Sequence, residues 1–344
     1  MPLIRGALLI SKMPEKSSTN NGSYADFYKG KKVLVTGGTG FVGSFVVKKL
    51  IAAGAEVCIA FRPSGGTTKK IDRLREVKGI AKMVQLDLLD ERAVHDGIST
   101  LMPAVVVNAA AVLSNTRSLD ALDDQIQSNF ITAVNLVKSA AKNKVGKFVH
   151  IGSIAEYGDA PSPFVETMRE QPTYPYSFSK IMATHAVLLC GKLSGMATTV
   201  VRPAAVFGPT QDFGLMLIPN IIKSALDGKD FDMNPGGQIR DLVYVEDLVD
   251  GILKAGASSH SDQQIFNLGS NTGYKIKDIA TILNKLMGNS IRINFGAEPY
   301  RPHDPMKYLM DASKAEKILG WSAQTPIEIA LQQTVNWYNF NIKR

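Results

Sequence analysis

An apolar run that ends in three evenly spaced glycines constrains the fold of this chain more than any other feature. Residues 33–35 predict a buried strand, and the segment after Gly43 continues as an amphipathic helix. Gly37, Gly40 and Gly43 would let backbone N–H groups and a helix N-terminus approach a pyrophosphate. A second predicted strand at 56–60 supplies the context that this motif requires. The turn therefore predicts dinucleotide binding, the alternative being a tight turn without a ligand.

Length, charge and cysteine content limit the class of protein. The 344 residues suffice for one large domain with a smaller lobe, and 45% hydrophobic with 20% charged residues is typical of globular chains. The net charge of +8 is spread along the sequence, which favours a phosphorylated small molecule over nucleic acid as the partner. No apolar segment has the length of a membrane span. Cys58 and Cys190 lack metal-ligand spacing, so we expect free thiols in the cytoplasm and no metal site.

Strands and helices alternate after the glycine turn, which predicts an α/β fold with a Rossmann-type, doubly wound parallel sheet and a smaller C-terminal α/β lobe. We expect residues 1–30 to form a flexible extension and 31–202 the dinucleotide-binding domain, completed by parts of 239–268. Residues 203–344 would form mainly the substrate lobe. The remaining predicted strands cover 82–86, 104–107 and 147–151, and the predicted helices cover 69–77, 90–99, 119–143, 176–192, 275–287 and 326–340.

Loops after the strands carry the candidate cofactor contacts, because ligands of such sheets bind beyond the carboxyl ends of the strands. Phe61 stands where NAD-binding folds usually place an acidic residue, and Arg62 follows, which favours NADP(H) with NAD as the alternative. Arg62 could also be an ordinary solvated loop residue. Asp87 could accept a hydrogen bond from the adenine amino group or cap the next helix. Residues 108–111 are small enough to pack closely against a cofactor or against a helix.

Ser153, Tyr176 and Lys180 form the candidate catalytic set. Tyr176 and Lys180 are four residues apart and share one helix face, so the ammonium group is expected to lower the pKa of the phenol. Tyr176 would then serve as acid and base for a carbonyl or alcohol. Ser153, from the end of the preceding strand, would donate to the same substrate oxygen.

These motifs, in this order, resemble those of the extended short-chain dehydrogenases/reductases, the group of nucleotide-sugar epimerases, dehydratases and 4-ketoreductases. The resemblance covers about residues 31–340 and includes the glycine turn at 36–43, Asp87, Asn129 and the segment 202–209. It implies that Lys180 binds the nicotinamide ribose, that Asn129 helps to position the active site, and that helices 119–143 and 176–192 form a homodimer. The expected cofactor contacts are Gly37, Gly40, Phe41, Val42, Gly43, Arg62, Asp87, Leu88, Ala109, Ala110, Asn129, Tyr176 and Lys180.

The resemblance also implies a nucleoside-diphosphate sugar as the substrate. Residues 236–247 resemble the segment in which an arginine, here Arg240, clamps the diphosphate, and Arg301 with Asp304 resembles the element that completes the grip. A guanidinium group suits bidentate phosphate recognition. Either arginine could instead form a structural ion pair with Asp241 or Asp304. Ser153, Arg240, Arg301 and Asp304 are thus the expected substrate contacts.

Residues after Ser153 bear on the reaction. The 4,6-dehydratases of the family place acidic residues directly after the catalytic Ser or Thr, whereas this chain has Ile154 and Ala155, with Glu156 one position too late and on the other side of an extended backbone. Together with Arg62, this favours an NADPH-dependent reductase of a nucleoside-diphosphate 4-keto-6-deoxyhexose. An NAD-dependent 4-epimerase is the alternative within the family. A non-catalytic NADP-binding sensor or scaffold, and a flavonoid-type or steroid-type ketone reductase, are alternatives outside it.

Overall fold

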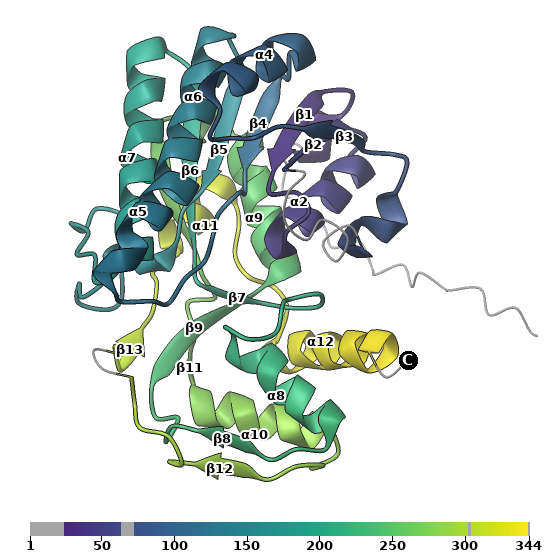
Figure 1. Ribbon diagram of the computed structural model, residues 1–344, viewed down its shortest axis with the longest axis vertical. Coiled ribbons are helices and arrows are strands. Elements are labelled where there is room, and N and C mark those ends of the chain that lie inside the picture. Colours follow the sequence, from purple (N-terminus) through teal and green to yellow (C-terminus); the bar gives the residue numbers. More distant parts are fainter. Residues whose placement is uncertain (1–23, 63–71, 302–303, 343–344) are drawn as a thin grey trace, which may run out of the picture.

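A parallel sheet of seven strands forms the centre of the larger domain (Figure 1). The computed structural model describes residues 24–62, 72–301 and 304–342. The strand order is β3-β2-β1-β4-β5-β6-β10. The chain adds β2 and β3 on one side of β1 and the later strands on the other side, and such sheets bind ligands at this switch between β1 and β4. The strands are β1 (Lys32–Thr36), β2 (Glu56–Phe61), β3 (Lys82–Gln85), β4 (Val105–Asn108), β5 (Lys147–Ile151), β6 (Ala197–Pro203) and β10 (Gln264–Leu268). This confirms the predicted Rossmann-type α/β fold.

Helices cover both faces of this sheet, and alternate residues of the strands supply the two cores. Leu34, Val106 and Phe148 face one layer of helices, whereas Val33, Val35 and their neighbours face the other. The strands are apolar on both sides because each face is covered. The first layer contains α4 (Glu91–Leu101), α6 (Thr132–Lys142) and α7 (Pro175–Ser194), and the second contains α2 (Phe41–Ala52) and α9 (Val245–Ala257).

Two predicted helices differ in their local geometry. The expected helix at 119–143 consists of η2 (Leu119–Ala121), α5 (Leu122–Gln125), the π-helical turn η3 (Ile126–Ile131) and α6. The expected helix at 69–77 is the 3₁₀ helix η1 (Asp72–Val77), and its first three positions lie outside the described residues. A π-helical turn inserts one extra residue per turn, and such turns occur frequently at functional sites.

The smaller lobe contains a mixed sheet, a two-stranded pair and three helices. In the mixed sheet, β9 (Ile239–Tyr244) pairs with β7 (Ala205–Phe207), β11 (Gly273–Lys275) and β13 (Lys307–Tyr308). The chain crosses between the lobes more than once, since α9 and β10 belong to the larger domain while β9 belongs to the smaller one. The remaining elements are β8 (Phe231–Met233), β12 (Ile293–Phe295), α8 (Leu217–Asp227), α10 (Ile276–Leu286), α12 (Ile327–Ile342), η5 (Ser259–Ser261) and α11 (Ser313–Leu319), the last of which packs on β10 and α9.

The prediction of a flexible extension through residue 30 is wrong for its last part. Residues 24–28 form helix α1 (Tyr24–Tyr28), and residues 1–23 lie outside the described part. Tyr28 is fully buried and donates a hydrogen bond to the Leu253 carbonyl, while Tyr24 donates to Asp250 at 2.9 Å. Both partners belong to α9. Packing against a distant helix therefore orders this segment, although the polar residues before it in the sequence suggested an extension.

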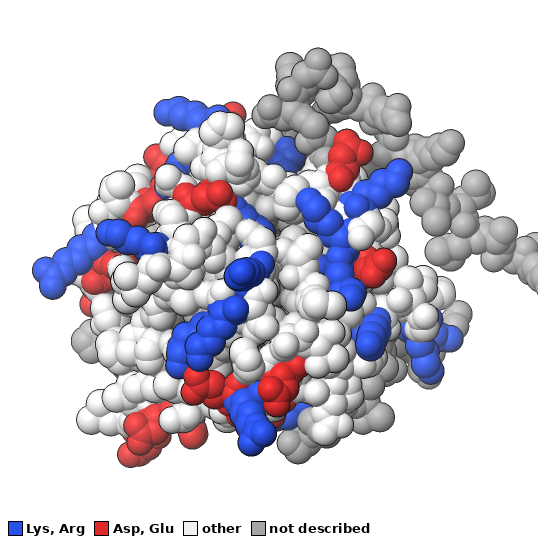
Figure 2. Space-filling view, turned by 90° about the horizontal axis from the view of Figure 1, so that it is seen from above, with Lys and Arg blue, Asp and Glu red and all other residues white. Residues whose placement is uncertain are grey.

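Charged side chains of both signs are interspersed on the molecular face seen from the top of Figure 1 (Figure 2). This distribution agrees with a net charge of +8 that is spread along the sequence. Across the part of the chain that the structure describes, none of the helices is both long enough and apolar enough to cross a bilayer.

Candidate active site

The glycine turn between β1 and α2 forms a tight cradle at the centre of the sheet. Gly37 has φ +66°, a conformation that favours glycine, and the Gly40 N–H donates to the Gly37 carbonyl at 2.8 Å. A Cβ atom on Gly43 would lie 2.2 Å from the Gly37 oxygen. No side chain caps the N-terminus of α2, so its amides remain directed at the cradle. The turn therefore fits the pyrophosphate of a dinucleotide.

The loop after β4 packs directly against this cradle. A Cβ atom on Gly37 would lie 2.5 Å from the Ala109 carbonyl oxygen and 2.6 Å from the Ala110 nitrogen. The Ala109 N–H donates to the Thr36 carbonyl at 3.1 Å. The structure thus brings Ala109 and Ala110 to the glycine turn, and Phe41 and Val42 stand in the first turn of α2 beside it.

The expected adenosine contacts follow β2 and β3, the strands beyond β1 in the sheet. Arg62 is exposed at the end of β2, and the next nine residues lie outside the described part. Asp87 is exposed and accepts a hydrogen bond from the Leu89 N–H at 3.1 Å. The cap of α4 is Asp90, which accepts from the Ala93 N–H at 2.9 Å, so the alternative in which Asp87 caps that helix is wrong.

Leu88 contributes to the same loop through its backbone. Its carbonyl oxygen accepts a hydrogen bond from the Asn135 side chain of α6 at 3.0 Å. This contact fixes the loop after β3 against α6. The roles of Arg62, Asp87 and Leu88 toward a cofactor remain predictions.

Ser153 and Tyr176 meet at the carboxyl end of β5. Ser153 caps the 3₁₀ helix η4 (Ile154–Tyr157), where its hydroxyl accepts from the Ala155 N–H at 3.1 Å. The same side chain lies near the phenol of Tyr176, in the first turn of α7, and acts to lower the pKa of that phenol. Lys180 follows one turn later, is 1% exposed and donates to the Ile151 carbonyl at 2.6 Å. The three predicted side chains are therefore assembled by β5, η4 and α7.

The pKa of Tyr176 is not lowered as the sequence predicted. Burial raises the pKa of this phenol above its ordinary value, and Tyr174 and Glu156 add to the effect, while the hydrogen bond from Ser153 opposes it. The physical reason is desolvation, which disfavours a buried phenolate. Lys180 is itself desolvated, and burial lowers its pKa to about 8 despite the opposing Glu156 carboxylate.

Glu156 is buried within the turn at residues 153–157, which begins at Ser153 and is called the catalytic turn below. It is fully buried, and one oxygen accepts from the Ser153 N–H at 2.8 Å. The other oxygen accepts from Arg202 Nε at 2.8 Å and from the Thr184 hydroxyl at 2.9 Å. The backbone after Ser153 is helical, so the expectation of an extended backbone is wrong. Both carboxylate oxygens of Glu156 are thus engaged by donors of the protein itself.

Asn129 holds the loop after β4 against α7. It lies in the π-helical turn and is 1% exposed. Its Oδ1 accepts from the Val112 N–H at 2.8 Å, and its Nδ2 lies 3.1 Å from the Ser179 hydroxyl. Asn129 thus bonds to protein groups on both sides of the site, which agrees with the implied positioning role.

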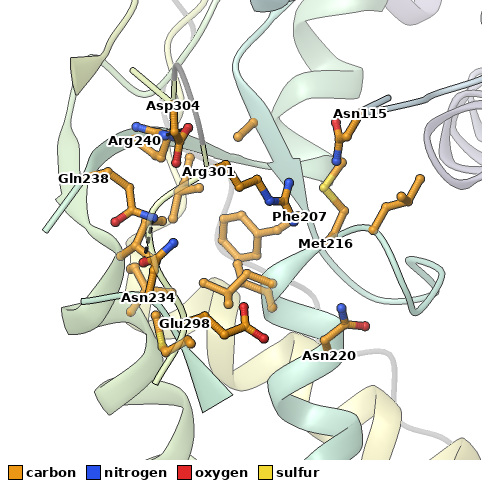
Figure 3. A pocket seen from close by; sticks show the side chains of 18 of the residues that line it. Asn115, Phe207, Met216, Asn220, Asn234, Gln238, Arg240, Glu298, Arg301 and Asp304 are labelled. Atoms are coloured by element: carbon orange, nitrogen blue, oxygen red, sulfur yellow. Dashed lines mark hydrogen bonds and ion pairs between the residues drawn. The ribbon is translucent and has the colours of Figure 1, made fainter. Parts of the chain in front are cut away.

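A pocket of about 490 Å³ lies in the smaller lobe (Figure 3). Its lining comes mostly from β7, from the loop before α8, from β8, β9 and α10, and from Glu298, Pro299, Arg301 and Asp304. Asn115 reaches it from the loop after β4 in the larger domain. A cavity of this size, lined by both polar and apolar side chains, is large enough for a small molecule.

Arg240, Arg301 and Asp304 all line this pocket. Arg240 pairs with Asp304 at 2.6 Å and donates to the Pro305 carbonyl at 2.7 Å, so the alternative of an Arg240–Asp304 ion pair occurs in the structure. Asp241 instead accepts hydrogen bonds from Ser270. Arg301 is exposed and extends to the centre of the pocket beside Phe207 (Figure 3).

Tyr308 connects the pocket with the catalytic turn and was not predicted. Its hydroxyl donates to the Ile154 carbonyl at 3.2 Å, and its strand position pairs with that of Arg240. His150, whose Nε2 lies 3.5 Å from Lys180 Nζ, was also missed, and Asn108, 3.1 Å from the same ring, was predicted only as part of the segment 108–111. Their positions at strand ends are visible in the sequence, but their pairing depends on the strand order.

The family model "NAD dependent epimerase/dehydratase family" matches residues 33–269. The chain is 27% identical to the probable dTDP-glucose 4,6-dehydratase of Sinorhizobium fredii, over 89% of this chain and 92% of that protein. It is also 27% identical to the UDP-glucose 4-epimerase of Erwinia amylovora, over 90% of this chain and 98% of that protein.

Solved structures show the same architecture. The UDP-glucose 4-epimerase of Thermotoga maritima is 28% identical, with a TM-score of 0.82 over 90% of this chain and 99% of that chain. An epimerase of Methanothermobacter thermautotrophicus is 27% identical, with a TM-score of 0.84 over 92% of this chain and 95% of that chain. The predicted resemblance to extended short-chain dehydrogenases/reductases is confirmed, and the chain belongs to the NAD-dependent epimerase/dehydratase family.

Proposed function

We propose that this protein acts at C4 of a nucleoside-diphosphate hexose as an NAD-dependent 4-epimerase. The observation that carries the proposal is the assembly of Ser153, Tyr176 and Lys180 beside the glycine cradle while Glu156 is withdrawn from the site by Arg202. Such a site can move a proton at a sugar oxygen, whereas the one carboxylate on the turn, Glu156, is engaged by Arg202. Its chemistry therefore suits oxidation and reduction at one carbon.

Each residue has a role that follows from its position. Tyr176 accepts the proton of O4 during oxidation and returns it during reduction, and Ser153 donates to the same oxygen. A bound nicotinamide would supply the exchange of hydride at C4. To accept that proton Tyr176 must first be ionised, and Lys180, one helical turn away on α7, would favour the phenolate when it is charged. In the reverse step the proton returns from Tyr176 to O4, so the residue is not consumed.

The nucleotide would occupy the pocket of the smaller lobe. Arg301 is exposed there, and Arg240, which is paired with Asp304, lines the same pocket, which supports a role for both guanidinium groups in binding a diphosphate. Tyr308 would hold the catalytic turn in a fixed position relative to this pocket through its hydrogen bond to the Ile154 carbonyl. Two relatives described above are UDP-glucose 4-epimerases, which supports both the substrate class and the reaction.

Other relatives are 4,6-dehydratases. The residues of the catalytic turn make that reaction less suitable for this protein. Such an enzyme needs an acid next to Ser153, but Ile154 and Ala155 are buried apolar residues and Glu156 is held by Arg202. Removing water from the sugar would leave this turn without a proton donor for the leaving oxygen.

An NADPH-dependent 4-ketoreductase is the second candidate, and one observation favours it. The end of β2 carries Phe61 and the exposed Arg62 where an acidic ribose ligand would indicate NAD. A reductase that consumes fresh hydride would draw on NADPH. A non-catalytic sensor is disfavoured because it would not need the assembled catalytic set.

We further propose that the protein is a homodimer and acts in the cytoplasm. Exposed apolar side chains on α7 support an interface there, namely Phe178 at 38%, Leu189 at 56% and Leu193 at 78% exposure. Sedimentation of the purified protein would test this part.

The test is to incubate the purified protein with hexoses linked to UDP, dTDP, CDP and GDP without added cofactor, and to follow the products by NMR. We expect interconversion of C4 epimers and release of NAD on heat denaturation. Tyr176→Phe should abolish turnover and retain the dinucleotide. Formation of a 4-keto-6-deoxy product would refute the epimerase, and oxidation of NADPH by 4-keto sugars would establish the second candidate.

A further inference from the structure

Arg73 joins the two lobes through the nitrogens of its guanidinium group. It lies in η1 of the larger domain, and its Nε donates to the Thr210 carbonyl at 2.9 Å. Its Nη2 pairs with the Asp212 carboxylate, and its Nη1 donates to the Thr39 carbonyl at 3.4 Å. Thr39 belongs to the glycine turn between β1 and α2, whereas Thr210 and Asp212 lie between β7 and α8. One side chain therefore contacts both the dinucleotide cradle and the smaller lobe.

The segment that Arg73 holds forms part of the pocket in the smaller lobe. Residues 208–216 connect β7 with α8, and we call them the wall loop. The residues of the wall loop that line the pocket are Gln211, Gly214, Leu215 and Met216. The position of the wall loop therefore affects the shape of the site in which the nucleotide sugar is proposed to bind.

The backbone of the wall loop is strained where Arg73 contacts it. Thr210 has φ +68°, in the left-handed region that a β-branched residue seldom adopts. Such a conformation persists only where the surrounding structure enforces it. The Thr210 hydroxyl is buried and has no hydrogen-bond partner among the described residues, so this side chain does not anchor the loop. The hydrogen bond from Arg73 to the Thr210 carbonyl therefore helps to hold a backbone conformation that would otherwise relax.

A different contact fixes the wall loop to its own lobe. The Tyr338 hydroxyl of α12 donates to the Gln211 carbonyl, and the ring of Tyr338 lies 5.4 Å from that of Phe213. These contacts stay within the smaller lobe, whereas Arg73 connects the loop to the larger domain. Loss of Arg73 would thus release the loop from the glycine turn without detaching it from α12.

The environment of Arg73 is suited to positioning more than to charge pairing. Its side chain is 9% exposed, whereas that of Asp212 is 74% exposed. An ion pair with so exposed a partner contributes little to stability. The other two contacts are to backbone carbonyls, and the rigid, planar guanidinium group fixes the directions of both. Arg73 therefore sets the distance between the glycine turn and the wall loop.

We propose that Arg73 is a positioning residue that couples dinucleotide binding at the glycine turn to nucleotide binding in the pocket. The inference rests on the proposed function, which assigns these two ligands to these two sites. A dinucleotide on the turn fixes the Thr39 carbonyl, which holds Arg73 in its bridging position. Arg73 in turn keeps the wall loop in the form that lines the pocket. Because coupling between two sites is reciprocal, each ligand raises the affinity for the other by the same factor.

The first test measures the binding of UDP, dTDP, CDP and GDP to the full chain by calorimetry, with and without bound NAD⁺. For a diphosphate that binds, we expect NAD⁺ to increase the affinity about tenfold, which is within the range typical of coupled sites. Arg73→Met keeps the apolar part of the side chain and removes its donors, so NAD⁺ should no longer change the affinity. Asp212→Ala, at an exposed position, keeps both carbonyl contacts and should lose only part of the effect.

The matched control is Glu76→Gln. Glu76 lies on the same helix η1 and pairs with Lys48 of α2 at 3.0 Å, so its contact stays within the larger domain. This variant should keep the full effect of NAD⁺. If Arg73 only stabilised the fold, Arg73→Met would lower the melting temperature and keep the effect of NAD⁺, and that result overturns the proposal.

The second test follows hydrogen exchange of the wall loop and needs no diphosphate. NAD⁺ should slow the exchange of amides in residues 210–216 of the unaltered protein and of Glu76→Gln, but not of Arg73→Met. Equal slowing in Arg73→Met contradicts the proposal. If no diphosphate binds, the proposed function and this inference both fail. If a diphosphate binds equally well with and without NAD⁺, the inference alone fails.

Discussion

Replacing Glu156 with Gln separates a structural carboxylate from a catalytic one. In the structure Glu156 forms a fully buried ion pair with Arg202 and also accepts from Thr184 and from the Ser153 N–H. Glu156→Gln keeps the shape of the side chain but removes the charge that compensates Arg202. If Glu156 is structural, this change should lower stability and retain turnover.

The expected loss of stability depends on the ion pairs that Arg202 keeps when Glu156 is replaced. Removing one partner of a buried pair costs about 3–5 kcal/mol, because the other charge is left buried. Arg202 keeps a second carboxylate, Glu170, at 2.6 Å, which favours the lower end of that range. We therefore expect a loss of about 3 kcal/mol, or about 4 °C in the melting temperature of a chain of 344 residues.

The assay is thermal unfolding together with turnover measured below the transition. Glu91→Gln is the matched control, since Glu91 pairs with Lys138 at 2.8 Å on the surface and its loss should leave the melting temperature unchanged. An unchanged melting temperature in Glu156→Gln, combined with lost turnover, would refute the reasoning. Glu156 would then be a catalytic acid, and the dehydratase would become the better assignment.

Three further changes have defined outcomes. Gly43→Ala places a Cβ atom 2.2 Å from the Gly37 oxygen, so calorimetry should show lost dinucleotide binding, and binding at the original affinity would contradict the cradle. Arg301→Ala should raise KM for the nucleotide sugar about tenfold with little change in kcat, because the contact is to a part of the substrate that does not react; a loss confined to kcat would speak against it. The pKa of Lys180 is about 8 in the folded protein and 10.5 ordinarily, so the unfolded chain binds more protons between these values. The stability of the unaltered protein relative to Lys180→Met should therefore rise by roughly 2 kcal/mol from pH 8 to pH 10, and a constant difference in denaturant titrations would count against a buried amine.

Local patterns sufficed to predict the frame of the site. Strand, glycine turn and helix follow one another within the first βα unit, and the four-residue spacing of Tyr176 and Lys180 places both on one helix face. Ser153 follows β5, and ligands of parallel sheets bind beyond the carboxyl ends of the strands, so Ser153 was correctly expected near Tyr176. These features depend on neighbours along the chain or on the regular geometry of a parallel sheet.

What was missed depends on contacts between distant segments. Glu156 meets Arg202 46 residues later, and no local pattern indicates which way its side chain turns. The pKa of Tyr176 depends mainly on burial by the surrounding chain, which no local pattern in the sequence reveals. Helix α1 is ordered by contacts with α9, more than 200 residues away.

The most direct test of the central claim follows deuterium placed at C4 of the nucleotide sugar that the protein turns over. Oxidation and reduction at C4 alone predict a product of inverted configuration that retains deuterium at C4 and takes up none from the solvent. Deuterium found at C6, with loss of water from the sugar, would contradict the account and establish a 4,6-dehydratase.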